Sequence, residues 1–108
     1  MNLQVQINTE LKHAEQARRR GNEGQARVCA RRAAGIAARE YFARRGETIR
    51  TPSAYDLLNK LVEDSSLSAD LRQIAAHLTL RVDEQFKLPP DLDLILEAKK
   101  LRDGLLLK

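Results

Sequence analysis

The stretch LRQIAAHL, residues 71–78, places an arginine and a histidine five positions apart. A neutral imidazole can take the proton from a ribose 2′-hydroxyl, while a guanidinium can stabilise the negative charge that builds on the adjacent phosphate. Arg72 and His77 could therefore cleave RNA without a metal ion, and Gln73 could assist by hydrogen-bonding the phosphate. The alternative interpretation is that the two are unrelated polar residues of one helix.

Helix geometry limits what this pair can do within one chain. Successive residues advance by about 100° around the axis, so Arg72 and His77 point about 140° apart. One cleft can collect both only through the reach of arginine or through a second copy of the chain across a twofold axis. Two apolar residues, Ala76 and Leu80, lie between them on the outward side, which favours a homodimer that buries both. Exposed leucines are also common on monomers, so an ordinary surface is the alternative.

Apolar residues recur with a helical period along nearly the whole chain, and strict alternation is almost absent, so the pattern predicts helices throughout. Glycines in GNEG and RRG should end the first two helices, and the prolines of KLPPD should end the fourth. The predicted segments are about 2–20, 22 or 23 to a cap at Gly46, a short one opened by Thr51 and Pro52, one from Ser68 to about 86, and a leucine-rich one from Pro90-Asp91 to near Gly104. The first two should form an antiparallel hairpin.

The chain has 108 residues, of which 43% are apolar and 31% charged, so we expect one globular all-α domain spanning residues 1–108. The core must be built from aliphatic residues and alanine, because there are two Tyr, two Phe and no Trp. The predicted buried stripe of the second helix is Ala26, Cys29, Ala30, Ala33, Ile36, Ala37 and Tyr41. Cys29 is interpreted as core packing, with a reactive thiol as the alternative.

Charge is unevenly distributed along the chain. Residues 1–50 hold eleven Arg or Lys against five Glu, whereas residues 51–108 hold eight against ten acids. The basic half permits a polyanion such as RNA as a partner, and the arginines at 27, 31, 32 and 39 could follow an RNA backbone. A solvated, arginine-rich helix face explains the same pattern.

No apolar run approaches the roughly 20 residues needed to cross a bilayer, so no membrane insertion is expected. The single cysteine cannot form an internal disulfide, and no secretion signal is recognisable, so we expect a cytoplasmic protein. No cofactor or metal is implied, because His13 has no His, Cys or carboxylate at a convincing ligand spacing and is interpreted as a surface residue.

The hairpin sequence AEQARRRGNEGQARVCARRAAGIAAREYFARRG, followed by a capped helix carrying RQIAAH, resembles the HEPN superfamily, whose ribonuclease members carry an Rx4-6H motif. Glu40, near the end of the second helix, also fits that family, and the resemblance covers nearly the whole chain. In the family the arginine is commonly followed by Asn, Asp or His, and this chain has Gln73. The resemblance implies an up-and-down four-helix bundle with a short additional C-terminal helix, and dimerisation that brings two Arg72–His77 pairs together.

Three functions follow as hypotheses. The resemblance implies either a metal-independent endoribonuclease, with toxin-like RNA cleavage by His77 as base and Arg72 as electrostatic stabiliser, or a HEPN partner of a nucleotidyltransferase in a toxin–antitoxin-like pair. The competing hypothesis is a non-catalytic helical module that binds other proteins, in which the Arg72–His77 pair is incidental.

Overall fold

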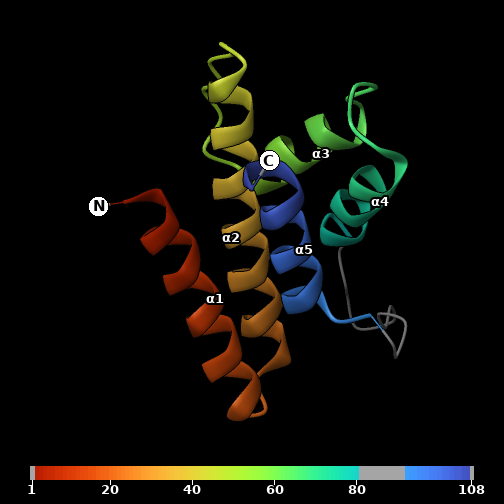
Figure 1. The fold of residues 1–108 in the computed structure, drawn as a ribbon. Helices are drawn as coiled ribbons and strands as arrows, with labels where there is room; N and C mark the ends of the chain where they lie inside the picture. Colours follow the sequence, from red (N-terminus) through yellow and green to blue (C-terminus); the bar gives the residue numbers. More distant parts are fainter. Residues whose placement is uncertain (1, 81–91, 108) are drawn as a thin grey trace.

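The computed structural model describes residues 2–80 and 92–107 (Figure 1). Every regular element in these residues is an α-helix, as the periodicity predicted: α1 Leu3–Arg19, α2 Glu23–Arg44, α3 Ala54–Val62, α4 Ala69–Leu78 and α5 Leu94–Leu106. Within these two ranges, none of the helices has the length and hydropathy that a bilayer span requires.

Local capping signals define the α1–α2 hairpin. The side chain of Asn2 caps the start of α1. After α1, Gly21 has φ of 77°, which residues with a Cβ rarely adopt, and the backbone N–H of Asn22 donates to the carbonyl of Ala17. Asn22 then caps α2 with its side chain, and Gly46, with φ of 79°, follows its end. The predicted boundaries of both helices are confirmed.

Helix α2 is the centre of the fold, because α1, α3 and α5 all pack against it (Figure 1). Its buried residues are mostly small and lie on several sides of the helix: Ala26, Cys29, Ala30, Ala33, Ala34, Gly35, Ala37, Ala38 and Phe42. The predicted stripe was too narrow for a helix with three neighbours. Ile36 and Tyr41, which it included, are only partly buried, and Phe42 is buried instead.

The predicted cap of α3 is wrong by two residues. The side chain of Ser53 accepts a hydrogen bond from the backbone N–H of Asp56 and caps the helix. The Thr51 hydroxyl instead accepts from the N–H of Ser53 and donates to the carboxylate of Asp56. Pro52 therefore precedes the helix and does not form its first turn.

Helix α4 starts after the predicted cap, Ser68, but ends at Leu78, well before the predicted end near residue 86. Arg31 of α2 explains this end. Its Nε donates to the carbonyl of Leu78 at 2.8 Å and its Nη2 to that of Leu80 at 3.1 Å. The guanidinium thus satisfies carbonyl groups at the end of the helix.

Helix α5 begins after its cap, Asp93, and ends at Leu106, two residues beyond Gly104. The predicted opening at Pro90-Asp91 lies outside the described residues. Gly104 lies inside the helix, where a Cβ atom would come within 2.5 Å of a Leu71 methyl group. The glycine therefore lets α4 pack closely against α5.

A polar cluster ties the turn after α3 to the end of α2. The Asp64 carboxylate accepts hydrogen bonds from the Ser66 hydroxyl and N–H, from Arg45, and from the Tyr41 hydroxyl. Burial raises the pKa of Asp64, but the bonds from Ser66, Arg45 and Tyr41 outweigh it and lower that pKa from 3.8 to about 2.

The cluster should make stability depend on acidity. A folded-state pKa below the unfolded value stabilises the fold fully above the unfolded pKa, and the stabilisation is lost as the pH falls through the folded pKa. Asp64→Asn should therefore lower the free energy of unfolding by about 1–2 kcal/mol at pH 6, and the difference should shrink between about pH 4 and pH 2. Urea titrations of both proteins across this range measure it, and a constant difference would contradict the assignment.

Candidate active site between helices α4 and α5

The main feature of the site is a contact between a histidine and a glutamate. His77 Nδ1 of α4 lies 2.6 Å from Glu97 Oε1 of α5. The Glu97 side chain is 12% exposed and the His77 side chain 32%, so the carboxylate is buried and the imidazole reaches solvent. Because a carboxylate only accepts hydrogen bonds, the contact places a hydrogen on Nδ1. Nε2, which has no hydrogen-bond partner in the described residues, is then the nitrogen that can take a proton.

Helix α4 positions the histidine. The buried side chains of Ala75 and Leu78 fix the rotation of the helix, which directs His77 toward α5. Arg31 holds the carbonyl of Leu78, the next residue, and its guanidinium lies 4.5 Å from the centre of the Tyr55 ring. The end of α4 is therefore anchored to α2 and α3.

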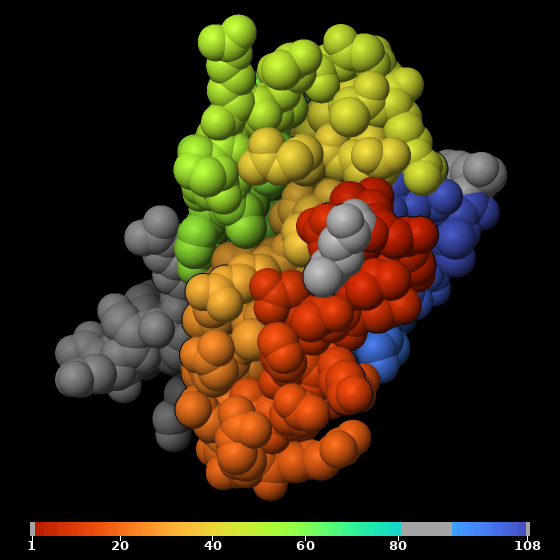
Figure 2. Space-filling view, turned by 90° about the vertical axis from the view of Figure 1, so that its left-hand side faces the viewer, coloured from red at the N-terminus to blue at the C-terminus, as the bar shows by residue number. Residues whose placement is uncertain are grey.

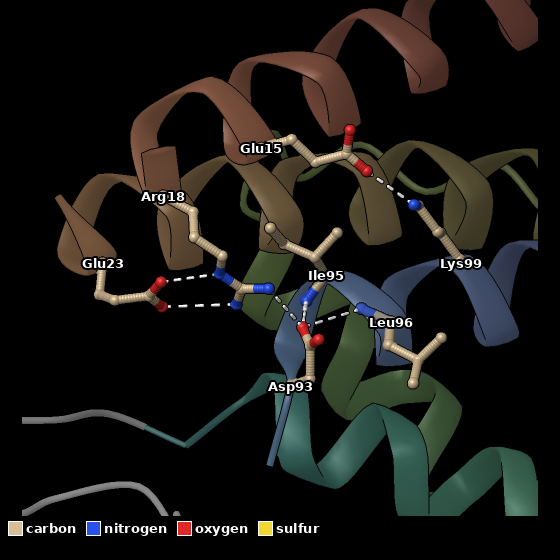
Figure 3. Close-up of polar contacts among 7 residues, drawn as sticks. All are labelled: Glu15, Arg18, Glu23, Asp93, Ile95, Leu96 and Lys99. Carbon is tan, nitrogen blue, oxygen red and sulfur yellow. Dashed lines mark hydrogen bonds and ion pairs between the residues drawn. The ribbon is translucent and has the colours of Figure 1, made fainter. Parts of the chain in front are cut away.

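Two ion-pair contacts position the glutamate by fastening α5 to α1 (Figure 3). Arg18 Nη1 lies 2.9 Å from Asp93 Oδ1, and Lys99 Nζ lies 2.7 Å from Glu15 Oε1. Glu97 lies between these two points along α5. The two ion pairs therefore hold in place the segment of α5 that carries Glu97.

Asp93 has a double role in this arrangement. Its carboxylate caps α5 by accepting from the backbone N–H groups of Ile95 and Leu96 (Figure 3). The same oxygen accepts from Arg18, whose Nε also donates to Glu23. Burial raises the pKa of Asp93, but the bond from Arg18 and the bonds from the backbone lower it below its usual value. This carboxylate is therefore ionised and engaged at neutral pH.

A cleft lies along the His77–Glu97 contact and consists of two adjoining hollows of about 450 and 360 Å³. His77, Glu97 and Lys100 line both hollows. Asp70 and Gln73 line the smaller one, so Gln73 and His77 lie at the same surface. Titratable groups and a cation thus surround a space large enough for a small ligand or part of a larger one.

The larger hollow also has an apolar side, formed by Leu80, Leu92 and Leu96. Leu80 is 42% exposed and Leu96 48%, which makes them two of the four large exposed apolar side chains in the described residues. Leu80 follows the end of α4, so it is not part of the helical ridge that the sequence predicted. Ala76, the other predicted interface residue, is half-buried on α4.

Arg72 does not share the cleft of its own chain. It is not among the residues that line either hollow. Its side chain is partly buried, and its Nε is the one fully buried side-chain nitrogen or oxygen among the described residues that lacks a hydrogen-bond partner. The wide angle between Arg72 and His77 on the helical wheel predicted this separation.

Several arginines of the basic half serve the fold. Arg39 donates to the carbonyls of Ile49 and Thr51, and Arg44 donates to that of Leu106. Figure 2 shows the face that this half of the chain forms, with α1 lying along α2. Of the arginines expected to follow an RNA backbone, Arg31 and Arg39 thus have internal partners. Arg32 is exposed.

The other candidate residues lie apart from the cleft. His13 is exposed on α1 and lies 3.7 Å from Glu10, and Cys29 is buried in α2. Nowhere in residues 2–80 and 92–107 do three or more His, Cys, Asp or Glu side chains gather closely enough to bind a metal ion.

Sequence reasoning missed Glu97 and Lys100. A signal was present for Glu97, which occupies a position in the apolar stripe of α5, between Leu94 and Leu101. A carboxylate on the buried face of a helix requires a partner, and His77 is that partner. Comparison of the chain with protein families, characterised proteins and solved structures finds no match. Any assignment of function to this chain therefore rests on the geometry of the cleft.

Proposed function

We propose that this protein is a HEPN-like, metal-independent endoribonuclease in which His77 is the general base. The observation that supports this proposal is the 2.6 Å contact between Nδ1 and Glu97, which orients the imidazole and leaves Nε2 without a hydrogen-bond partner among the described residues. The scaffold in this proposal is the up-and-down four-helix bundle of that superfamily with an additional C-terminal helix, α5, in a cytoplasmic protein.

The proposed reaction needs no group besides the protein and the RNA. Nε2 of His77 takes the 2′-hydroxyl proton, and the 2′-oxygen attacks the adjacent phosphorus. The bond to the 5′-oxygen breaks, and this oxygen leaves with a proton from solvent or from the imidazolium. The products are a 2′,3′-cyclic phosphate and a 5′-hydroxyl. Glu97 stabilises the imidazolium that forms during the step.

Arg72 requires a second copy of the chain in this proposal. It does not line the cleft of its own protomer, so it stabilises the phosphate charge from across a twofold axis. Gln73 lies within the cleft and hydrogen-bonds the phosphate.

The reaction has a direct test. Incubation of single-stranded RNA with the protein and excess chelator should give fragments that end in 2′,3′-cyclic phosphate, detected by mass spectrometry. The matched all-2′-deoxy strand should remain intact, because it lacks the nucleophile. Absence of cleavage across a mixed-sequence RNA pool, or cleavage of the deoxy strand, would contradict the proposal.

The homodimer is a separate prediction. Leu80 exposes apolar surface beside the cleft, and burying a leucine contributes about 1.5–3 kcal/mol. Leu80→Asp should therefore shift the protein from dimer to monomer in light scattering at tens of micromolar. Val5→Asp is the matched control, because Val5 is 48% exposed on α1 and should leave the dimer intact. A monomeric unmodified protein at this concentration would refute the prediction.

The exposed leucines also favour a second candidate, a non-catalytic helical module that binds another protein through this cleft, such as a nucleotidyltransferase or an antitoxin. The two candidates differ in their prediction for Glu97. A binding module needs the His77–Glu97 pair only for stability, whereas the ribonuclease needs it for the reaction.

A further inference from the structure

Lys100 is a cation that lines the cleft beside the His77–Glu97 pair. It follows Glu97 by three positions on α5, so the two side chains lie on the same side of the helix. It lines both hollows of the cleft together with His77 and Glu97, and it is exposed.

The other cations of α5 have partners. Lys99 pairs with Glu15, and Arg102 donates to Asp103. Lys100 has no hydrogen bond or ion pair with any described residue, and its side chain is exposed.

Among the described residues, no carboxylate of the cleft forms an ion pair with Lys100. Asp93 is held by Arg18 and by the start of α5, and Glu97 accepts a hydrogen bond from His77. The remaining acid is Asp70, at the rim of the smaller hollow, which has no side-chain hydrogen bond or ion pair with any described residue and weakens the attraction for an anion.

We propose that Lys100 binds a phosphodiester of single-stranded RNA beside His77, within one protomer. The phosphate lies between Lys100 and the imidazole, and a neighbouring base packs on Leu96, on the apolar side of the same cleft. A duplex holds its bases inside the helix, so the ligand is single-stranded. The catalytic context rests on the proposed function, but the binding itself does not require cleavage.

The experiment uses a fluorescein-labelled 2′-O-methyl RNA 12-mer, which binds as single-stranded RNA but cannot be cleaved because the 2′-oxygen is blocked. Fluorescence anisotropy gives its Kd at several salt concentrations. Lys100→Gln should raise the Kd by about 5-fold or more and lower the slope of log Kd against log salt by about 0.7, the value for one phosphate contact on a single strand. Lys60→Gln, at an exposed lysine of α3, should change neither.

Asp70→Asn should change the Kd in the opposite direction. Removal of this negative charge from the rim of the cleft should lower the Kd by about 2-fold or more, because like charge no longer opposes the phosphate. Melting curves of the variants should overlay that of the unmodified protein, since Lys100 and Asp70 are exposed.

The outcomes separate this proposal from the enzymatic one. A higher Kd for Lys100→Gln, together with no cleavage of ordinary RNA by the unmodified protein, supports the phosphate site and contradicts the ribonuclease. Cleavage that persists while Lys100→Gln leaves Kd and salt slope unchanged overturns the role of Lys100 and leaves the ribonuclease standing. No binding of the probe by the unmodified protein also overturns it.

Discussion

His77→Asn should reduce RNA cleavage by roughly 100-fold or more while the protein stays folded. The asparagine amide can donate to Glu97 as Nδ1 does, so the buried carboxylate keeps a hydrogen bond. The amide cannot take a proton from the 2′-hydroxyl, so the reaction loses its base. The rate of cleavage in chelator, measured beside a melting curve, separates the loss of chemistry from the loss of structure.

The alanine variant is a poorer test than the sequence alone suggested. Both Arg72 and His77 lie off the buried stripe of α4, which predicts changes within about 0.5 kcal/mol on removal. However, His77→Ala leaves the buried Glu97 carboxylate without a partner, which costs about 1–3 kcal/mol. We therefore expect this variant to be both inactive and less stable.

Glu97→Gln completes the set. The amide still hydrogen-bonds the imidazole but no longer stabilises the imidazolium, so cleavage should fall. The double variant with His77→Asn should be no slower than His77→Asn alone, because the two residues act as one unit. Equal rates for the unmodified protein and all variants would refute the assignment of the base.

Gly35→Val should lower the free energy of unfolding by about 3 kcal/mol, because it forces apart two helices that are in contact. A Cβ at Gly35 would lie 2.8 Å from the Cβ of Ala54 and 3.1 Å from its Cα. Ala54 is the first residue of α3 and has no flexible side chain that could move away. The melting temperature should fall by more than about 10 °C for a domain of this size.

Gly104→Ala is the control for this effect. Its Cβ would come within 2.5 Å of Leu71 Cδ2, which is nominally a closer contact. The contacting atoms are the end of a half-buried leucine that can rotate, and alanine is favoured over glycine in a helix by about 0.5–1 kcal/mol. Its stability should therefore change by less than about 1 kcal/mol. An equal loss for both variants would show that rigidity of the neighbour does not decide the cost.

The sequence by itself determined those elements whose signals are local. Gly21 and Gly46 mark the ends of α1 and α2 because positive φ excludes most residues with a Cβ, and Asn22 and Ser68 cap the helices that follow them. These interactions join residues that are close in the sequence, so the sequence alone is enough to predict them. The helical class and the position of His77 on α4 could be predicted for the same reason.

The site itself was decided by tertiary structure. Glu97 meets His77 across 20 residues, and Arg31 ends α4 from 47 residues away, so neither contact leaves a pattern in a short window. The same packing places Lys100, and not Arg72, on the cleft. Which face of α5 meets which face of α4 depends on the fit of Leu71 against Gly104, and on the ion pairs that fasten α5 to α1. Such a choice among packings is made by side-chain shape and charge in three dimensions, which helical periodicity alone does not specify.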